Sequence, residues 1–213
     1  MLEPPFLSAT RAGYNAIATA YTQHFEGVLE GDPWARAVLT AFAELVGDTG
    51  PVADIGSGPG RVAAFLSAAG VRVHGIDLSP AMVEMARRSF PDIRFDEGSM
   101  TALDIADHSL AGALAWYSLI HIPPAERAAV LAEFHRVLRP GAPLLLAFQA
   151  GRDVSHHDEG FGHAISLDFH RLVPEEIEDL LEGVGFTVDA RLGRRARGEE
   201  PTPQAYLLAT RSS

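Results

Sequence analysis

Between residues 51 and 149 the chain alternates short apolar runs with longer segments of helical periodicity. The apolar runs predict strands and lie at residues 51–56, 71–77, 92–98, 109–118 and 142–149. The segments that predict helices lie between them, at residues 59–70, 79–90 and 123–141. Because strands that alternate with helices are joined by right-handed crossovers, the pattern predicts a mainly parallel sheet with helices on both faces. The expected fold class is a doubly wound α/β fold.

The segments on either side of this alternation differ from it. Residues 1–48 have helical periodicity, and Asp32 followed by Pro33 is typical of a helix start. Residues 150–173 interrupt the rhythm, have no strong periodicity and carry four of the nine histidines. After them we expect one more helix and an antiparallel pair of strands, at residues 173–185, 186–193 and 203–211. We expect residues 1–213 to form a single domain, with 150–173 as an inserted cap.

Composition narrows the classes of partner. The formal net charge is −11, which disfavours nucleic acid because its binders normally present a basic face. No apolar run is long enough to span a bilayer, and the N-terminus lacks the basic and apolar regions of a signal peptide. The chain has no cysteine, so it has no thiolate metal site and no disulfide framework. We expect a cytoplasmic protein that acts on a small molecule, with no membrane or nucleic-acid partner.

The turn after the first predicted strand contains three glycines, Gly56, Gly58 and Gly60, in the sequence DIGSGPG. A bare turn that leads into a helix lets an anionic group approach free backbone N–H groups. The spacing is not the G-x-G-x-x-G of dinucleotide sites, because Arg61 follows the third glycine. Asp54 is poorly suited to a neighbouring pyrophosphate but suits an ammonium beside a carboxylate. The loop is therefore predicted to hold the amino-acid end of a ligand.

A second acid, Asp77, ends the second predicted strand, and an acid at this place can accept hydrogen bonds from both ribose hydroxyls. A ligand with a ribose and an amino-acid end is S-adenosylmethionine. We therefore expect S-adenosylmethionine as the cofactor and S-adenosylhomocysteine as its product.

At this point the sequence resembles the class I S-adenosylmethionine-dependent methyltransferases that act on small molecules. The resemblance is carried by VADIGSGPGRVAAFL, VHGIDLSPAMVEMAR, FDEGSMTAL and FHRVLRPGAPLLLAF, and it extends over about residues 10 to 211. It implies a Rossmann-like seven-stranded sheet in the order 3-2-1-4-5-7-6, with strand 7 antiparallel. It also implies that residues 1–48 form a helical lid.

The family's cofactor residues carry over by position, as the resemblance implies. Gly56, Ser57 and Gly58 surround the methionine end, and Asp54 lies near its amine. Asp77 matches the ribose acid, with Leu78 beside the adenine. Ser99 and Met100 fall where the adenine edge and face are met, and Ser99 replaces the Asp that is frequent in the family. Tyr14 and Tyr21 resemble lid tyrosines that close over the cofactor.

The acceptor side of the site is expected at the end of the fourth predicted strand, where ligands of doubly wound sheets bind. Trp116 there offers an aromatic face to a sulfonium, and it can equally be an ordinary core residue. A hydroxyl acceptor needs a base, for which the candidates are His121, His157 and His163. We expect no metal, because the chain lacks the paired histidine spacing of zinc sites and an acid at this strand end.

The function predicted from the sequence is transfer of a methyl group from S-adenosylmethionine to oxygen or nitrogen of a small-molecule acceptor by in-line displacement. Two alternatives stay open at this point. One is a noncatalytic S-adenosylmethionine-binding protein, and the other is a nicotinamide-dependent oxidoreductase. The expected assembly is a monomer or a homodimer.

Overall fold

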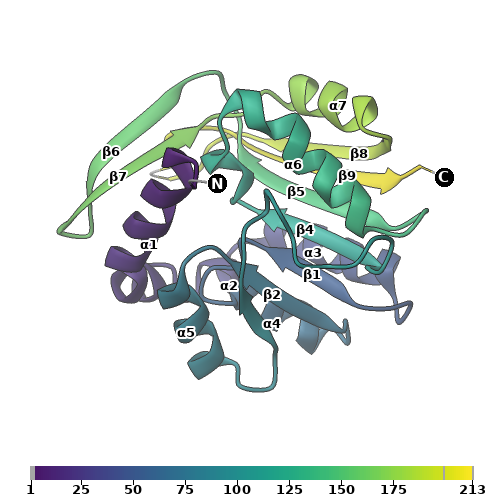
Figure 1. Cartoon of the computed structure of the whole chain (residues 1–213), viewed down its shortest axis with the longest axis horizontal. Helices are drawn as coiled ribbons and strands as arrows, with labels where there is room; N and C mark the ends of the chain where they lie inside the picture. Colours follow the sequence, from purple (N-terminus) through teal and green to yellow (C-terminus); the bar gives the residue numbers. More distant parts are fainter. Residues whose placement is uncertain (1–2, 199, 213) are drawn as a thin grey trace.

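A computed structural model describes residues 3–198 and 200–212, so residues 1–2 of the predicted lid, 199 and 213 lie outside it. A seven-stranded sheet runs through the molecule in the order β3-β2-β1-β4-β5-β9-β8 (Figure 1). Its strands are β1 (Val52–Ile55), β2 (Val73–Asp77), β3 (Phe95–Glu97), β4 (Gly112–Trp116), β5 (Pro143–Gln149), β8 (Phe186–Arg194) and β9 (Gln204–Arg211).

The first five strands are parallel, and β9 is antiparallel to both β5 and β8. Since β8 and β9 are the sixth and seventh strands of this sheet, the predicted Rossmann-like order with an antiparallel seventh strand is confirmed.

Helices cover both faces of the sheet. They are α1 (Pro5–His24), α2 (Val28–Gly31), α3 (Pro33–Val46), α4 (Arg61–Ala68), α5 (Pro80–Ser89), α6 (Pro124–Val137) and α7 (Pro174–Gly183), with one 3-10 turn, η1 (Leu119–His121). Local chemistry fixes several helix starts, since the Asp32 carboxylate accepts the N–H of Trp34 at 2.9 Å and the Ser79 hydroxyl accepts that of Met82 at 3.1 Å.

Two apolar clusters hold these layers together. On one face, α3 and α4 bury Leu39, Phe42 and Leu66 against β1 and β4. On the other face, α6 and α7 bury Phe134 and Leu181 against β4, β5 and β9. Burial of these side chains is the main stabilising contribution to the sheet and its helices. Because these strands are parallel, their carboxyl ends lie at the same edge of the sheet, and the candidate functional site lies at this edge.

The sequence analysis assigned no helix or strand to residues 150–173. Here the chain forms an antiparallel hairpin of β6 (Val154–Gly160) and β7 (His163–His170), separate from the main sheet. Its two-residue turn consists of Phe161 and Gly162, with φ values of 52° and 78°. Hairpin turns of this kind need positive φ at both central residues, which Phe seldom adopts. Most side chains of both strands are exposed, so no apolar alternation revealed them in the sequence.

Helix α1 packs between the hairpin and α5 (Figure 1). On the α5 side, Asn15 Oδ1 accepts hydrogen bonds from Ser79 Oγ at 2.7 Å and from the N–H of Ala81 at 3.2 Å. On the hairpin side, Gly13 lets β7 approach closely, because a Cβ at this position would lie 2.8 Å from Leu167 Cδ2. The helix therefore extends over the carboxyl edge of the sheet, as a lid would.

None of the helices in residues 3–198 and 200–212 combines the length and the apolar character needed to cross a membrane.

The packing role of the third glycine of the loop is testable with a matched pair of variants. Gly60 has φ +86°, and an added Cβ would lie 2.6 Å from Phe95 Cζ, whereas Gly70 has φ +88° and open space around it. We expect Gly70→Ala to lower the free energy of unfolding by about 1–2 kcal/mol through backbone strain. Gly60→Ala should cost about 1–3 kcal/mol more, through overpacking. Urea unfolding measures both, and equal losses would contradict the packing role.

Candidate functional site

Two adjoining pockets open at the carboxyl edge of the sheet. A narrow pocket of about 90 Å³ lies toward β2 and β3, and a wide pocket of about 540 Å³ lies toward α2, α3 and the β8–β9 connection. Six residues line both pockets and so mark their junction: Tyr14, Tyr21, Gly56, Gly58, Trp116 and Tyr117. A ligand that extends from one pocket to the other must pass between these side chains.

The glycine loop forms the floor of this junction. Gly56 has φ +79°, and a Cβ there would lie 2.2 Å from Ser118 Cβ, so a side chain has no room. Gly58 has φ +52° and no heavy atom within 4 Å of an added Cβ, so its backbone is bare toward the pocket. Ser57 Oγ is buried and has no hydrogen-bond partner. The expected free N–H groups are not found in the loop itself, because those of Gly56 and Ser57 donate to the Ile76 oxygen and that of Gly58 donates to Asp77. What the loop leaves open to a ligand is close approach at Gly58.

Asp54 lies directly before this loop and is fully buried, yet neither of its carboxylate oxygens has a hydrogen-bond partner. Burial and, to a smaller extent, the nearby charge of Asp77 raise its pKa to about 7, while the backbone N–H of Ala63 opposes the rise. Burying a carboxylate without a partner costs free energy, and a cation or a hydrogen-bond donor beside it lowers this cost. Because Asp54 lines the wide pocket, a ligand ammonium can supply both.

Asp77 lines the narrow pocket together with Leu78, Ser99 and Met100. Its Oδ2 accepts the N–H of Gly58 at 2.7 Å and its Oδ1 accepts the N–H of Ser79 at 2.8 Å. Burial raises its pKa to about 6, while these two backbone hydrogen bonds oppose the rise. Each carboxylate oxygen has a further lone pair, so the group can hold the loop and still accept hydroxyl donors from a ligand.

His121 and Tyr14 form a hydrogen-bonded pair beside the junction. Tyr14 Oη lies 2.8 Å from His121 Nε2, and His121 Nδ1 lies 3.0 Å from the backbone oxygen of Asp168. A carbonyl oxygen only accepts, so Nδ1 carries the proton and Nε2 presents its lone pair to the Tyr14 hydroxyl. Burial lowers the pKa of His121 to about 4, which keeps the ring neutral near pH 7.

His157 and His163, the other two candidate bases, lie exposed on the hairpin and are not among the residues lining either pocket. The hairpin acts on the site in another way, because the Asp168 carbonyl fixes the tautomer of His121 and the Phe169 ring packs against it at 4.9 Å. Over the described part of the chain, no group of three His, Asp, Glu or Cys side chains could hold a metal ion.

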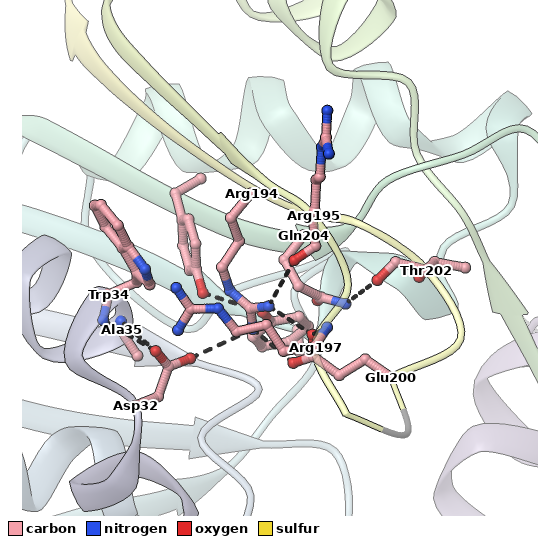
Figure 2. Close-up of polar contacts among 11 residues, drawn as sticks. Asp32, Trp34, Ala35, Arg194, Arg195, Arg197, Glu200, Thr202 and Gln204 are labelled. Carbon is pink, nitrogen blue, oxygen red and sulfur yellow. Dashed lines mark hydrogen bonds and ion pairs between the residues drawn. The ribbon is translucent and has the colours of Figure 1, made fainter.

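The outer wall of the wide pocket comes from a segment that the sequence analysis treated as a simple connection. Figure 2 shows Arg194, at the end of β8, reaching Glu200 in the β8–β9 connection and Asp32 at the start of α3. The two Arg194–Glu200 contacts measure 2.5 and 2.6 Å, and the Asp32 contact measures 3.4 Å. Arg197 lies over the Trp34 ring at 5.8 Å, and neither residue lines the pocket.

These wall residues belong to no sequence motif. Arg194 and Glu200 are 6 positions apart, but Arg194 and Asp32 are 162 positions apart. The signal that could have found them is the concentration of arginines and acids between two strands that pair.

Tyr117 stands at the junction in an unusual backbone conformation, with φ +55°. Non-glycine residues seldom adopt positive φ, and where they do they cluster at functional sites. The neighbouring Trp116 ring packs at 5.4 Å from that of Tyr206, and both line the wide pocket. The aromatic faces expected near the acceptor are therefore present at the pocket junction.

Comparison with known proteins shows which proteins this chain resembles. A family model described as a methyltransferase domain matches residues 52–141. The chain is 35% identical over 107 residues to a demethylmenaquinone methyltransferase of Chlorobaculum parvum. The matched segment covers 49% of this chain and 44% of that protein. It therefore spans less than half the length of this curated relative.

Solved structures extend the likeness to the whole fold. Magnesium protoporphyrin IX methyltransferase of Synechocystis, with bound S-adenosylmethionine, gives a TM-score of 0.76 at 18% identity and covers 100% of both chains. The 1,6-didemethyltoxoflavin-N1-methyltransferase of Burkholderia thailandensis gives 0.72 at 22% identity, over 100% of this chain and 92% of that one. At these identities the likeness shows the fold alone.

The role of Asp77 is testable by binding. Asp77→Ala removes a charged acceptor, so we expect it to weaken S-adenosylhomocysteine binding by about ten- to a hundredfold or more. Calorimetry measures the dissociation constant, and circular dichroism checks that the variant is folded. Asp96→Ala is the matched control, because Asp96 lies on β3 and does not line either pocket. Unchanged affinity in folded Asp77→Ala would refute the ribose assignment.

Proposed function

Because this chain belongs to the class I S-adenosylmethionine-dependent methyltransferase family, we propose that it transfers a methyl group from S-adenosylmethionine to a hydroxyl oxygen of a small-molecule acceptor. The cofactor would extend along the narrow pocket and across the junction, and the acceptor would occupy the wide pocket. The observation that carries the choice of a hydroxyl is the neutral, buried His121, whose Nε2 lone pair faces the junction through Tyr14.

The residues present fit this cofactor. The unpartnered carboxylate of Asp54 suits its ammonium, and the bare backbone at Gly58 suits close approach of its methionine end. Asp77 suits the ribose, and Leu78, Ser99 and Met100 line the pocket where the adenine would lie. S-adenosylmethionine supplies a methyl group on a sulfonium, which is already activated for displacement. The protein then mainly needs to align the acceptor and exclude water.

A hydroxyl acceptor must lose its proton as its oxygen takes the methyl group. Tyr14 Oη can accept that proton while its own proton passes to His121 Nε2. No free phenolate forms in this concerted transfer, which matters because burial raises the pKa of Tyr14 well above its usual value. The Asp168 carbonyl keeps Nδ1 protonated, so Nε2 is the basic nitrogen throughout.

The same proposal assigns roles to the larger segments. Residues 1–48 act as the lid and the β6–β7 hairpin acts as the cap of one methyltransferase domain. The packing of α1 across the pockets and the contact of Phe169 with His121 support these roles. We further propose that the protein acts in the cytoplasm, as the cysteine-free composition favours. A noncatalytic binder would share the pockets but would show no turnover.

The test of function is turnover with labelled S-adenosylmethionine against a panel of aromatic and aliphatic hydroxyl compounds. With an acceptor in hand, His121→Ala should lower kcat by about 10²–10⁴-fold, because it removes the proton acceptor. Tyr14→Phe should lower kcat as well, since it removes the hydroxyl between acceptor and His121. Cofactor affinity in both variants should stay close to wild type, since neither residue is assigned a polar contact with the cofactor.

The pH dependence of kcat gives a second readout. Since burial lowers the pKa of His121 to about 4, the ring is neutral above that pH and becomes protonated below it. The acidic limb assigned to His121 should therefore fall at about pH 4, well below the usual histidine range. His163→Ala is the control, because His163 is exposed outside the pockets. Full turnover in His121→Ala would contradict the base and indicate an amine acceptor.

Mobility of the lid can be tested by hydrogen exchange. α1 packs on β7 and α5 and buries Leu7, Ile17 and Ala18, but it does not pair with the sheet, so we expect it to open more readily than the sheet. Amides of α1 should gain protection when S-adenosylhomocysteine binds, while those of α6 should change little. Equal protection of α1 with and without the ligand would contradict the lid.

A further inference from the structure

Two glutamines lie side by side where β5 ends and β9 begins, and both line the wide pocket. Gln149 and Gln204 are direct partners in the antiparallel register of these strands. The next pair along, Ala150 and Pro203, shares a backbone hydrogen bond of 2.8 Å, so the glutamines form a non-hydrogen-bonded pair. Side chains of such pairs lie closest together. The two amides are therefore neighbours on one face of the sheet, within reach of one ligand group.

A neighbouring arginine fixes which end of the Gln149 amide is left for a ligand. Arg171 Nη1 donates to Gln149 Oε1, and a guanidinium can only donate, so the oxygen end of the amide faces Arg171. Arg171 is buried and does not line the wide pocket, so it holds the amide from outside the cavity. The Nε2 end, with its two N–H groups, is the end left to face a ligand. Gln149 therefore offers the pocket a hydrogen-bond donor.

The Gln204 amide is fixed in the opposite sense (Figure 2). Its Nε2 donates to the backbone oxygen of Thr202 at 2.8 Å, and a carbonyl oxygen can only accept, so the nitrogen end is engaged. Gln204 is 4% exposed, which leaves its side chain little room to turn over. The end left for a ligand is Oε1, an acceptor. The pair therefore presents a donor and an acceptor next to each other.

An aromatic wall lies beside the glutamine pair. Two residues back along β5, Ala147 pairs with Tyr206 on one side and with Trp116 of β4 on the other. Residues two apart on a strand share a face, so this row lies on the same side of the sheet as the glutamines. With the small Ala147 between them, the two ring centres are 5.4 Å apart, and both residues line the wide pocket. A flat ligand packed on these rings would direct its edge toward the two amides.

We propose that the methyl acceptor is a planar aromatic compound with a cyclic amide on its edge. Its carbonyl accepts from Gln149 Nε2 and its N–H donates to Gln204 Oε1. This inference rests on the proposed function, because it takes the wide pocket as the acceptor site. It adds a substrate class and two specificity-determining residues to that function.

Other edges fit the two amides less well. A hydroxyl beside a carbonyl has the same donor and acceptor, but such a pair closes a hydrogen bond within the ligand and leaves no donor for Gln204. A carboxylate would bring an acceptor against Gln204 Oε1, which needs a donor. The cyclic amide is the neutral group that satisfies both glutamines.

The experiment compares three bicyclic aromatic ligands that carry the same free hydroxyl: 7-hydroxy-2-quinolone, 7-hydroxycoumarin and 2-naphthol. The first has a carbonyl beside an N–H, the second has a ring oxygen in place of the N–H, and the third has neither group. Calorimetry measures their binding to protein saturated with S-adenosylhomocysteine, at a pH where all three hydroxyls are neutral. Saturation with S-adenosylhomocysteine is established first, in a separate titration.

The variants are Gln149→Met and Gln204→Met, since Met has a similar length and lacks the amide. Gln23→Met is the matched control, because Gln23 is exposed on α1 and lines neither pocket. Thermal unfolding checks that each variant is folded. If one of them does not fold, the order of the three affinities in wild type still decides.

We expect wild type and Gln23→Met to bind 7-hydroxy-2-quinolone about tenfold or more tightly than 7-hydroxycoumarin, because a site built to accept a hydrogen bond rejects the analogue that lacks the donor. Gln204→Met should remove this preference by weakening only the quinolone. Gln149→Met should weaken the quinolone and the coumarin alike, by about tenfold, because they share the carbonyl. Binding of 2-naphthol should be the same in all four proteins.

Two results would overturn this inference alone. If wild type does not prefer 7-hydroxy-2-quinolone to both other ligands, or binds none of the three, the glutamines do not select a cyclic amide. If each variant weakens all three ligands equally, the glutamines only support the pocket wall. Failure of wild type to bind S-adenosylhomocysteine in the first titration would instead refute the proposed function, and this inference with it.

Discussion

The rest of the site depends on one carboxylate, that of Asp77, which joins three elements at the edge of the sheet. It accepts the N–H of Gly58 in the glycine loop and the N–H of Ser79 at the start of α5, while belonging itself to the end of β2. Ser79 in turn donates to Asn15 of the lid helix. The loop, the narrow pocket and the lid are therefore positioned by one short chain of hydrogen bonds, and movement of any of them disturbs the others.

A second set of contacts joins the β6–β7 hairpin to His121. The hairpin contributes a backbone carbonyl and the Phe169 ring to His121, whereas its own exposed histidines stay outside the pockets. His121 is then bound from the other side by Tyr14 of the lid. Because α1 and β7 also pack on each other at Gly13 and Leu167, we expect closure of one segment to order the other. In the proposed mechanism, His121 Nε2 would then be fully positioned only when both segments are in place.

Sequence reasoning succeeded where the determinants are local. The alternation of strands and helices predicted the mainly parallel sheet, and the resemblance to the methyltransferase family predicted its strand order. Asp32 predicted a helix start that its hydrogen bond with the N–H of Trp34 confirms. The sequence did not predict the hairpin, because most side chains of β6 and β7 face solvent and a Phe-Gly turn lacks the usual hairpin signature. It also missed the wall around Arg194, whose ion pair with Asp32 joins residues 162 positions apart. Such contacts exist only after the chain has folded, so no local pattern records them.

The charges of the wide pocket bear on the acceptor. Two arginines among the described residues line this pocket: Arg61 follows the glycine loop directly, on the cofactor side, and Arg194 has both of its terminal nitrogens bound by Glu200. Asp32 adds a further negative charge beside it. An acceptor with a carboxylate or a phosphate would therefore enter without an arginine to pair with, at a high desolvation cost. Trp116 and Tyr206 offer aromatic faces at the same place. We therefore expect an uncharged or cationic acceptor, with its hydroxyl directed toward Tyr14 and its apolar body packed against these rings.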